Sequence, residues 1–202
     1  RVVFASTAAS YGDVSADQLP IEESQPLSPL SFYGLSKVTV ERYLALYQQC
    51  FQLDYVVLRF ANVYGERQGD GGEGGVISIF TKRLAAGQGI TVYGDGSQTR
   101  DFVYAGDVAN GIYAALTTPN KNTVYNISTQ TEISLLELIR TLGDIAGRVI
   151  TPDYAPPREG DIDRSMLSHE KAAVGLDWQP QVSLREGLRR TYEDFCQRSE
   201  NK

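Results

Sequence analysis

Tyr33 and Lys37 are the pair of residues whose types and spacing best suit proton transfer. They lie four residues apart, so on a helix both side chains share one face and the ammonium can approach the phenol. A nearby cation favours the phenolate form of a tyrosine, which can then accept and return a proton near neutral pH. Because Y-x-x-x-K also occurs on many helix surfaces, its sequence context decides its meaning.

Polar residues follow two apolar runs that have no helical period. Ser6 and Thr7 come after Val2 to Ala5, and Asn62 comes soon after Tyr55 to Phe60. Such runs predict buried strands of a parallel sheet. Doubly wound folds build their sites at the carboxyl ends of these strands, so the sequence predicts that the polar residues lie near the tyrosine.

The order of the predicted elements indicates an α/β fold with a doubly wound, Rossmann-type parallel sheet. Apolar spacing predicts a helix over residues 32–50, between the two strands. Two capping boxes, Ser134 to Glu137 and Ser183 to Glu186, predict the starts of two further helices. The remaining predictions are helices over 76–86, 107–116 and 168–174, and strands over 90–93, 100–104, 123–127 and 149–154.

A buried parallel strand needs neighbours on both sides, yet this chain opens on one. We therefore expect the natural protein to be longer at its N-terminus. Residues 1–66 are predicted to form the C-terminal part of a Rossmann domain whose first strands are missing. Residues 67–202 are predicted to form mainly a smaller mixed α/β domain, with some segments returning to the first.

The composition narrows the classes of partner. A formal net charge of −6 and a pI near 4.9 argue against a nucleic-acid surface, which needs clustered Lys and Arg. No apolar run approaches the roughly 20 residues that span a bilayer, so a cytoplasmic protein is expected. Cys50 and Cys196 are far apart and are read as ordinary thiols, and no metal site is predicted.

Two further signals are set aside. Gly69 to Gly74 matches G-x-G-x-x-G, but a dinucleotide fingerprint sits directly after the first strand of its sheet, so this segment is read as a loop. His169, the only histidine, has no companion for metal binding or for a catalytic triad. It is read as a solvated residue at a helix start.

Five motifs together resemble a known family: STAASYG, YGLSK, LRFANVYG, VYGDGSQTRDFVY and PREGDIDRS. The chain resembles the extended short-chain dehydrogenases, also called NAD-dependent epimerases/dehydratases, and within them the UDP-glucose and UDP-N-acetylglucosamine 4-epimerases. The resemblance covers essentially the whole chain. It implies an NAD-dependent enzyme of nucleotide-sugar metabolism that acts as a homodimer when complete. The chain by itself, which would hold only part of NAD, is expected to be inactive.

The resemblance also implies catalytic roles. Tyr33 would remove the proton of the sugar 4-hydroxyl while hydride moves from C4 to NAD. Lys37 would bind the nicotinamide ribose and favour the phenolate of Tyr33, and Thr7 would hydrogen-bond the same sugar hydroxyl. The 4-keto sugar would then rotate and take the hydride back on its other face. The residues expected to bind NAD are Ala5, Ser6, Tyr33, Lys37, Phe60 and Ala61.

Substrate-binding roles follow from the same resemblance. Arg100 and Arg158 would clamp the diphosphate, and Tyr93 would stack near the base. A surface salt bridge is the alternative for the arginines, and a core position is the alternative for the tyrosine. The other expected contacts are Asn62 to the diphosphate, Val76 and Ile77 in the nucleotide pocket, Asp161 to the ribose hydroxyls and Ser165 near the sugar C2 substituent.

Ser165 carries the prediction of sugar range. In 4-epimerases a small residue at this position admits N-acetyl sugars, so activity on UDP-GlcNAc/GalNAc is expected besides UDP-Glc/Gal. Related dehydratases and decarboxylases usually place an acidic residue directly after the catalytic Ser/Thr, whereas this chain has Ala8. Two alternatives stay open: another nucleotide-sugar dehydratase, decarboxylase or reductase, and an inactive fragment that only binds nucleotide sugar.

Overall fold

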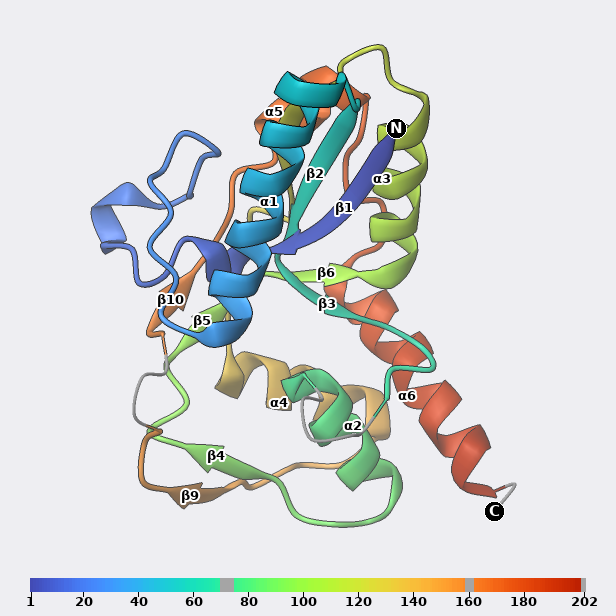
Figure 1. The fold of residues 1–202 in the computed structure, drawn as a ribbon. Coiled ribbons are helices and arrows are strands. Elements are labelled where there is room, and N and C mark those ends of the chain that lie inside the picture. Colours follow the sequence, from blue (N-terminus) through green and yellow to red (C-terminus); the bar gives the residue numbers. More distant parts are fainter. Residues whose placement is uncertain (70–74, 159–161, 201–202) are drawn as a thin grey trace.

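The computed structural model describes residues 1–69, 75–158 and 162–200, and two layers build the fold (Figure 1). The upper layer surrounds a parallel sheet, and the lower layer holds three helices and a pair of short strands. Most of the glycine loop after Gly69, and Asp161, lie outside the described residues.

The upper sheet contains the three long strands that the sequence predicts. Its order is β1 (Val2–Thr7), β2 (Tyr55–Phe60) and β7 (Thr123–Ile127), and both pairings are parallel. Thr7 lies opposite Phe60, which in turn lies opposite Ile127. The carboxyl ends of the strands therefore meet at one edge, as a doubly wound sheet requires.

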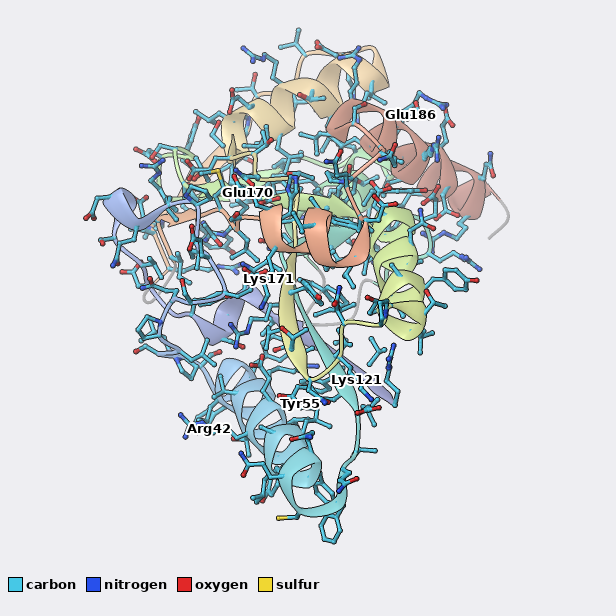
Figure 2. The ribbon with its side chains drawn as sticks, turned by 90° about the horizontal axis from the view of Figure 1, so that it is seen from above. Arg42, Tyr55, Lys121, Glu170, Lys171 and Glu186 are labelled. Atoms are coloured by element: carbon cyan, nitrogen blue, oxygen red, sulfur yellow. The ribbon has the colours of Figure 1, made fainter. Side chains whose placement is uncertain are left out.

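Helices cover both faces of this sheet. Alternate residues of β2 point to opposite faces. Val56 and Leu58 join a core with α3 (Ala105–Thr117) and α5 (Glu170–Leu176), whereas Arg59 reaches Glu41 on α1 (Phe32–Phe51). Figure 2 shows Arg42 on α1 and Lys171 on α5, with the two helices in different parts of the view. The Rossmann-like expectation is confirmed.

The lower layer has its own core. The helices α2 (Val76–Ala85), α4 (Leu135–Ala146) and α6 (Leu184–Glu200) pack together. Their contacts bury apolar side chains such as Phe80 and Leu138. Beside them, β4 (Thr91–Tyr93) pairs with β9 (Asp153–Ala155). The predicted strand over 149–154 begins only at Asp153, because the pairing with β4 begins there, opposite Thr91.

Short strands join the two layers, and most of them were not predicted from the sequence. The predicted strand over 100–104 is wrong as one unit: it is two strands, β5 (Thr99–Arg100) and β6 (Phe102–Tyr104), separated by Asp101. The division arises because each half pairs with different partners. The pairings are β6 with β3 (Asn62–Tyr64), and β5 with β8 (Ile133–Ser134) and β10 (Arg164–Ser165).

The two capping boxes differ in the structure. At α4, Ser134 and Glu137 exchange both hydrogen bonds, which confirms the first box. At α6 the Glu186 N–H donates to Ser183 Oγ at 3.3 Å, but the Glu186 carboxylate pairs with two arginines of its own helix instead. Figure 2 shows Glu186 near the beginning of α6.

His169 precedes α5 and is not the solvated residue that the sequence suggested. Its ring is half-buried and meets the Trp178 ring edge-on at 6.2 Å between centroids. Burial lowers the pKa of His169, since the apolar surroundings disfavour the charged imidazolium. Among the helices in the described ranges, none is long and apolar enough to cross a membrane.

Candidate active site

The start of α1 is built to meet the turn that follows β1. Ser31 caps the helix, since its Oγ accepts the Gly34 N–H at 3.0 Å. A Cβ on Gly34 would lie 2.6 Å from the Ala9 carbonyl oxygen, so only glycine lets the turn pack this closely. In that turn Thr7 Oγ1 accepts the Ala9 N–H at 3.2 Å. The glycine of YGLSK therefore allows Thr7 to approach Tyr33.

Tyr33 and Lys37 lie on one face of α1, as their spacing predicts. The Lys37 Nζ lies 5.6 Å from the centroid of the Tyr33 ring and donates a hydrogen bond to the Ala5 carbonyl at 2.9 Å. It also lies 5.2 Å from the centroid of Phe4. The ammonium is thus held between β1 and the phenol ring, while the tyrosine itself is 53% exposed and open to a ligand.

A cleft of about 390 Å³ opens beside this pair, at the carboxyl ends of β1 and β2. Seven of the residues predicted for the site line it: Thr7, Tyr33, Phe60, Ala61, Asn62, Arg100 and Ser165. Six others were not predicted: Ala8, Ala9, Gly12, Leu30, Ser31 and Ile162. Ser31 could have been found, because a serine just before a helical motif signals a cap.

A second compartment of about 230 Å³ continues from the first. Asn62 and Arg100 line both, so the two form one trough. At its far end the Arg158 guanidinium lies 4.0 Å from the centroid of the Tyr93 ring. Val76 lines this compartment as predicted, together with Ile79, Phe80, Thr91, Gln98 and Leu135, which were not predicted.

Arg100 and Ser165 are neighbours across paired strands. Ser165 of β10 is the register partner of Arg100 in β5. The Arg100 Nη1 donates to the Thr99 carbonyl at 2.8 Å and to the Asp163 carbonyl at 3.4 Å. Two residues 65 positions apart in sequence are therefore fixed side by side at the middle of the trough.

Asp101, between β5 and β6, holds the strand ends around Asn62 and Arg100 by hydrogen bonds. Its main-chain oxygen accepts the Asn62 N–H at 2.9 Å. Its carboxylate accepts the Thr129 N–H, the Thr129 hydroxyl and the Gln130 N–H at 2.7–3.0 Å. Burial raises the pKa of Asp101 to about 6, against the opposing effect of these hydrogen bonds. The residue ties the loop after β7 to the strand ends that carry Asn62 and Arg100.

Two predicted site residues turn away from the trough. Ile77 is 2% exposed in the lower core and does not line the trough, so its side chain does not reach the compartment that Val76 lines. Val76, Ile79 and Phe80 of the same helix do line the trough, at the spacing i, i+3, i+4, and Phe80 also packs in the lower core. That spacing could have identified Ile79 and Phe80 from sequence.

Ser6 is the second such residue. Its side chain is buried and its Oγ donates to Glu41 on α1, so the hydroxyl does not face the trough. Ala5 lies beside the site rather than in its lining and contributes its carbonyl to Lys37. Asp161, predicted to bind ribose, lies outside the described residues. Over the described ranges, no cluster of three or more His, Cys, Asp or Glu side chains could hold a metal ion.

Comparison with known proteins identifies the group to which this geometry is similar. Residues 1–128 match the family model described as "NAD dependent epimerase/dehydratase family". The chain is 39% identical over 201 residues to a UDP-glucose 4-epimerase from Mycolicibacterium smegmatis, covering 99% of this chain and 64% of that protein.

Two solved structures show the same likeness in three dimensions. The Thermotoga maritima UDP-glucose 4-epimerase with UDP-glucose superposes with a TM-score of 0.92 at 39% identity, covering 99% of this chain and 64% of that one. The Thermus thermophilus UDP-glucose 4-epimerase complex with NAD gives 0.86 at 40% identity, covering 96% and 63%. The chain thus spans less than two thirds of the length of these relatives.

Proposed function

The chain belongs to the NAD dependent epimerase/dehydratase family, and from this premise we propose that it carries the catalytic and substrate-binding residues of a UDP-sugar 4-epimerase. One observation carries the proposal: a single trough runs from Thr7 and Tyr33 at one end, past Arg100 at its middle, to Tyr93 and Arg158 at the other end. A nucleotide sugar has the matching order of parts, with a reactive sugar, a diphosphate and a flat base.

The catalytic end fits the nicotinamide end of NAD. Phe60 and Ala61 offer apolar surface for a flat ring, and the Lys37 ammonium is already oriented there by its hydrogen bond to Ala5. When bound, NAD supplies the acceptor for the hydride of sugar C4 and returns that hydride. The hydroxyl of Ser6 points toward Glu41 on α1, so any contact from Ser6 to the cofactor would come from its main chain.

The proton is handled by the chain's own side chains. Tyr33 takes the proton of the 4-hydroxyl as the C4–H bond breaks, which leaves a 4-keto sugar. The Lys37 ammonium favours the phenolate, and Thr7 hydrogen-bonds the same oxygen. After the keto sugar turns in the cleft, Tyr33 returns the proton as hydride reaches the opposite face. The configuration at C4 is inverted with no net oxidation or reduction.

The other end of the trough binds the nucleotide. Arg100 and Arg158 clamp the diphosphate with Asn62, because the guanidinium fork suits phosphate oxygens. Tyr93 stacks on the base, beside Val76. Asp161 accepts hydrogen bonds from the ribose hydroxyls. We propose a division of the chain near residue 66 into two parts, with α3, β7 and α5 returning to the first; the two separate apolar cores support it.

An epimerase assay of the complete gene product with NAD and UDP-glucose tests the proposal, and appearance of UDP-galactose is the expected result. Ala8, which occupies the position after Thr7, argues against the dehydratase and decarboxylase alternatives. The non-catalytic alternative is tested by isothermal titration with UDP and with NAD. Binding of UDP without binding of NAD to the complete gene product would favour that alternative.

The sugar range is tested at Ser165. Its small side chain lines the catalytic cleft, which leaves room for an N-acetyl group at C2. The Ser165→Tyr variant is expected to lower kcat/KM for UDP-GlcNAc about 100-fold or more, since a bulky ring there overlaps the N-acetyl group. Turnover of UDP-glucose should stay within a fewfold of wild type. Unchanged turnover of UDP-GlcNAc would refute the assignment.

A homodimer formed through α1 is also part of the proposal. Several apolar side chains of the helix are exposed, among them Phe32, Leu35, Tyr43, Leu46 and Phe51. Exposed apolar side chains gathered on one helix favour association with another protein surface. The Leu46→Glu variant is expected to sediment as a monomer, because it places a charge in the interface. Leu116→Glu on α3 is the matched control, with 52% exposure against 53% for Leu46. If the Leu46→Glu variant were still a dimer, this face of α1 would not be the dimer interface.

A cytoplasmic location remains a proposal as well. Cys50 and Cys196 are free thiols in the structure. Unpaired thiols are common where the surroundings are reducing, as in the cytoplasm.

A further inference from the structure

A buried polar network lies beneath the catalytic end of the trough. Its members are Ser6, Tyr11, Glu41, Arg59 and Asn126, and none of them is more than 8% exposed. Glu41 is the centre, because both of its oxygens are occupied. Oε1 accepts from Ser6 Oγ at 2.5 Å and from Arg59 Nε at 3.1 Å, and Oε2 accepts from Arg59 Nη2 at 2.6 Å.

The remaining nitrogen of the guanidinium continues the network. Arg59 Nη1 donates to the Tyr11 hydroxyl at 2.9 Å, and that hydroxyl donates to Asn126 Oδ1 at 2.7 Å. Burial raises the pKa of Tyr11 to about 12, so its proton stays in place at neutral pH. The Asn126 amide then donates to the Ile21 carbonyl at 2.9 Å. The network therefore runs from α1 through β1 and β2 to β7.

Four members lie close in the chain to residues of the site. Ser6 directly precedes Thr7, and Arg59 directly precedes Phe60. Glu41 lies one helical turn after Lys37 and two turns after Tyr33, on the same side of α1. Tyr11 closes the turn that contributes Ala8 and Ala9 to the cleft.

Stability alone does not account for a buried ion pair at this place. Burying two charges costs so much hydration that apolar residues of similar volume are often equally stable or more stable. Proton transfer, in contrast, depends strongly on geometry, and a displacement of about 1 Å can lower a rate on the order of 100-fold. A rigid support for the reacting groups is therefore the better account of the pair.

We propose that Glu41 and Arg59 are positioning residues: their ion pair fixes α1 against β1 and β2 and so sets Tyr33 and Lys37 in place relative to Thr7. This inference rests on the proposed epimerase function. It predicts that the geometry of the catalytic end is lost without the ion pair, even in a variant whose stability has been restored by apolar replacements. Binding of the nucleotide end, which uses Arg158 and Tyr93 in the other layer, should not depend on it.

Three variants of the complete gene product separate positioning from stability. Glu41→Gln leaves Arg59 buried without its full counter-charge, and should lower both Tm and kcat. The double variant Glu41→Leu with Arg59→Met removes both charges, and should recover most of the Tm while kcat stays on the order of 100-fold below wild type. Leu142→Ala is the control. It leaves a cavity in the lower core and should lower Tm without lowering kcat.

Two measurements accompany kcat. The Kd for UDP from isothermal titration should be unchanged in all three variants. Amide hydrogen exchange over residues 7–12 and 33–37 should be faster in both network variants and unchanged in Leu142→Ala, which reports on local positioning without catalysis. A double variant with wild-type kcat and wild-type exchange would overturn the inference. A wild-type protein without epimerase activity would instead refute the proposed function, and the exchange data would still decide on positioning.

Discussion

Replacing Tyr33 with Phe is expected to lower kcat for UDP-glucose by about 10²–10⁴-fold, the range in which positioned acid–base groups contribute. The change removes the one oxygen that takes and returns the proton of the sugar 4-hydroxyl. The ring and its packing near Lys37 are kept. The KM for UDP-glucose should change by no more than a fewfold, since the nucleotide end of the trough is untouched. Steady-state kinetics of the complete gene product with NAD measures both constants.

Tyr113→Phe is the control for this prediction. Tyr113 lies on α3 and is 70% exposed, against 53% for Tyr33, but it lies outside the trough and outside the proposed interface. Its kcat should equal that of wild type. If Tyr33→Phe retained kcat within tenfold of wild type, Tyr33 would not be the acid–base group, and the reaction would have to be assigned to other residues.

Removing Arg100 and Arg158 together is expected to weaken binding of UDP by about 10²–10⁴-fold. Hydrogen bonds to charged groups contribute about 1.5–3 kcal/mol each, and every 1.4 kcal/mol is tenfold in affinity. Both guanidinium groups line the nucleotide compartment, and Arg158 also lies against the Tyr93 ring. Isothermal titration with UDP measures the Kd of the double variant Arg100→Ala with Arg158→Ala and of each single variant.

Arg164 supplies the control for the arginine prediction. It adjoins Ser165 in β10, but its guanidinium pairs with Glu132 and is 43% exposed. Arg164→Ala should leave the Kd for UDP within about twofold of wild type, because an exposed ion pair contributes little. A double variant that bound UDP as tightly as wild type would show that the trough is not the nucleotide site.

The longest elements could be predicted from sequence because their signals are local. The strands β1, β2 and β7 are apolar runs, and α1 shows apolar and aromatic residues at helical spacing. The first capping box specified the start of α4 for the same reason. The strands β3, β8 and β10 could not be found, because two or three residues carry no period and become strands only by pairing with distant segments.

The same distinction applies to the candidate site. Sequence by itself determined the spacing of Tyr33 and Lys37 and the polar ends of the first two strands, since both depend on neighbours in the chain. Only the tertiary structure decided that Ser165 lies beside Arg100, that Ile77 faces the core, and that Ser6 turns toward Glu41. Those outcomes depend on pairing and burial between segments far apart in the chain. A local pattern shows which side chains share a face, but it does not show which face a distant segment will cover.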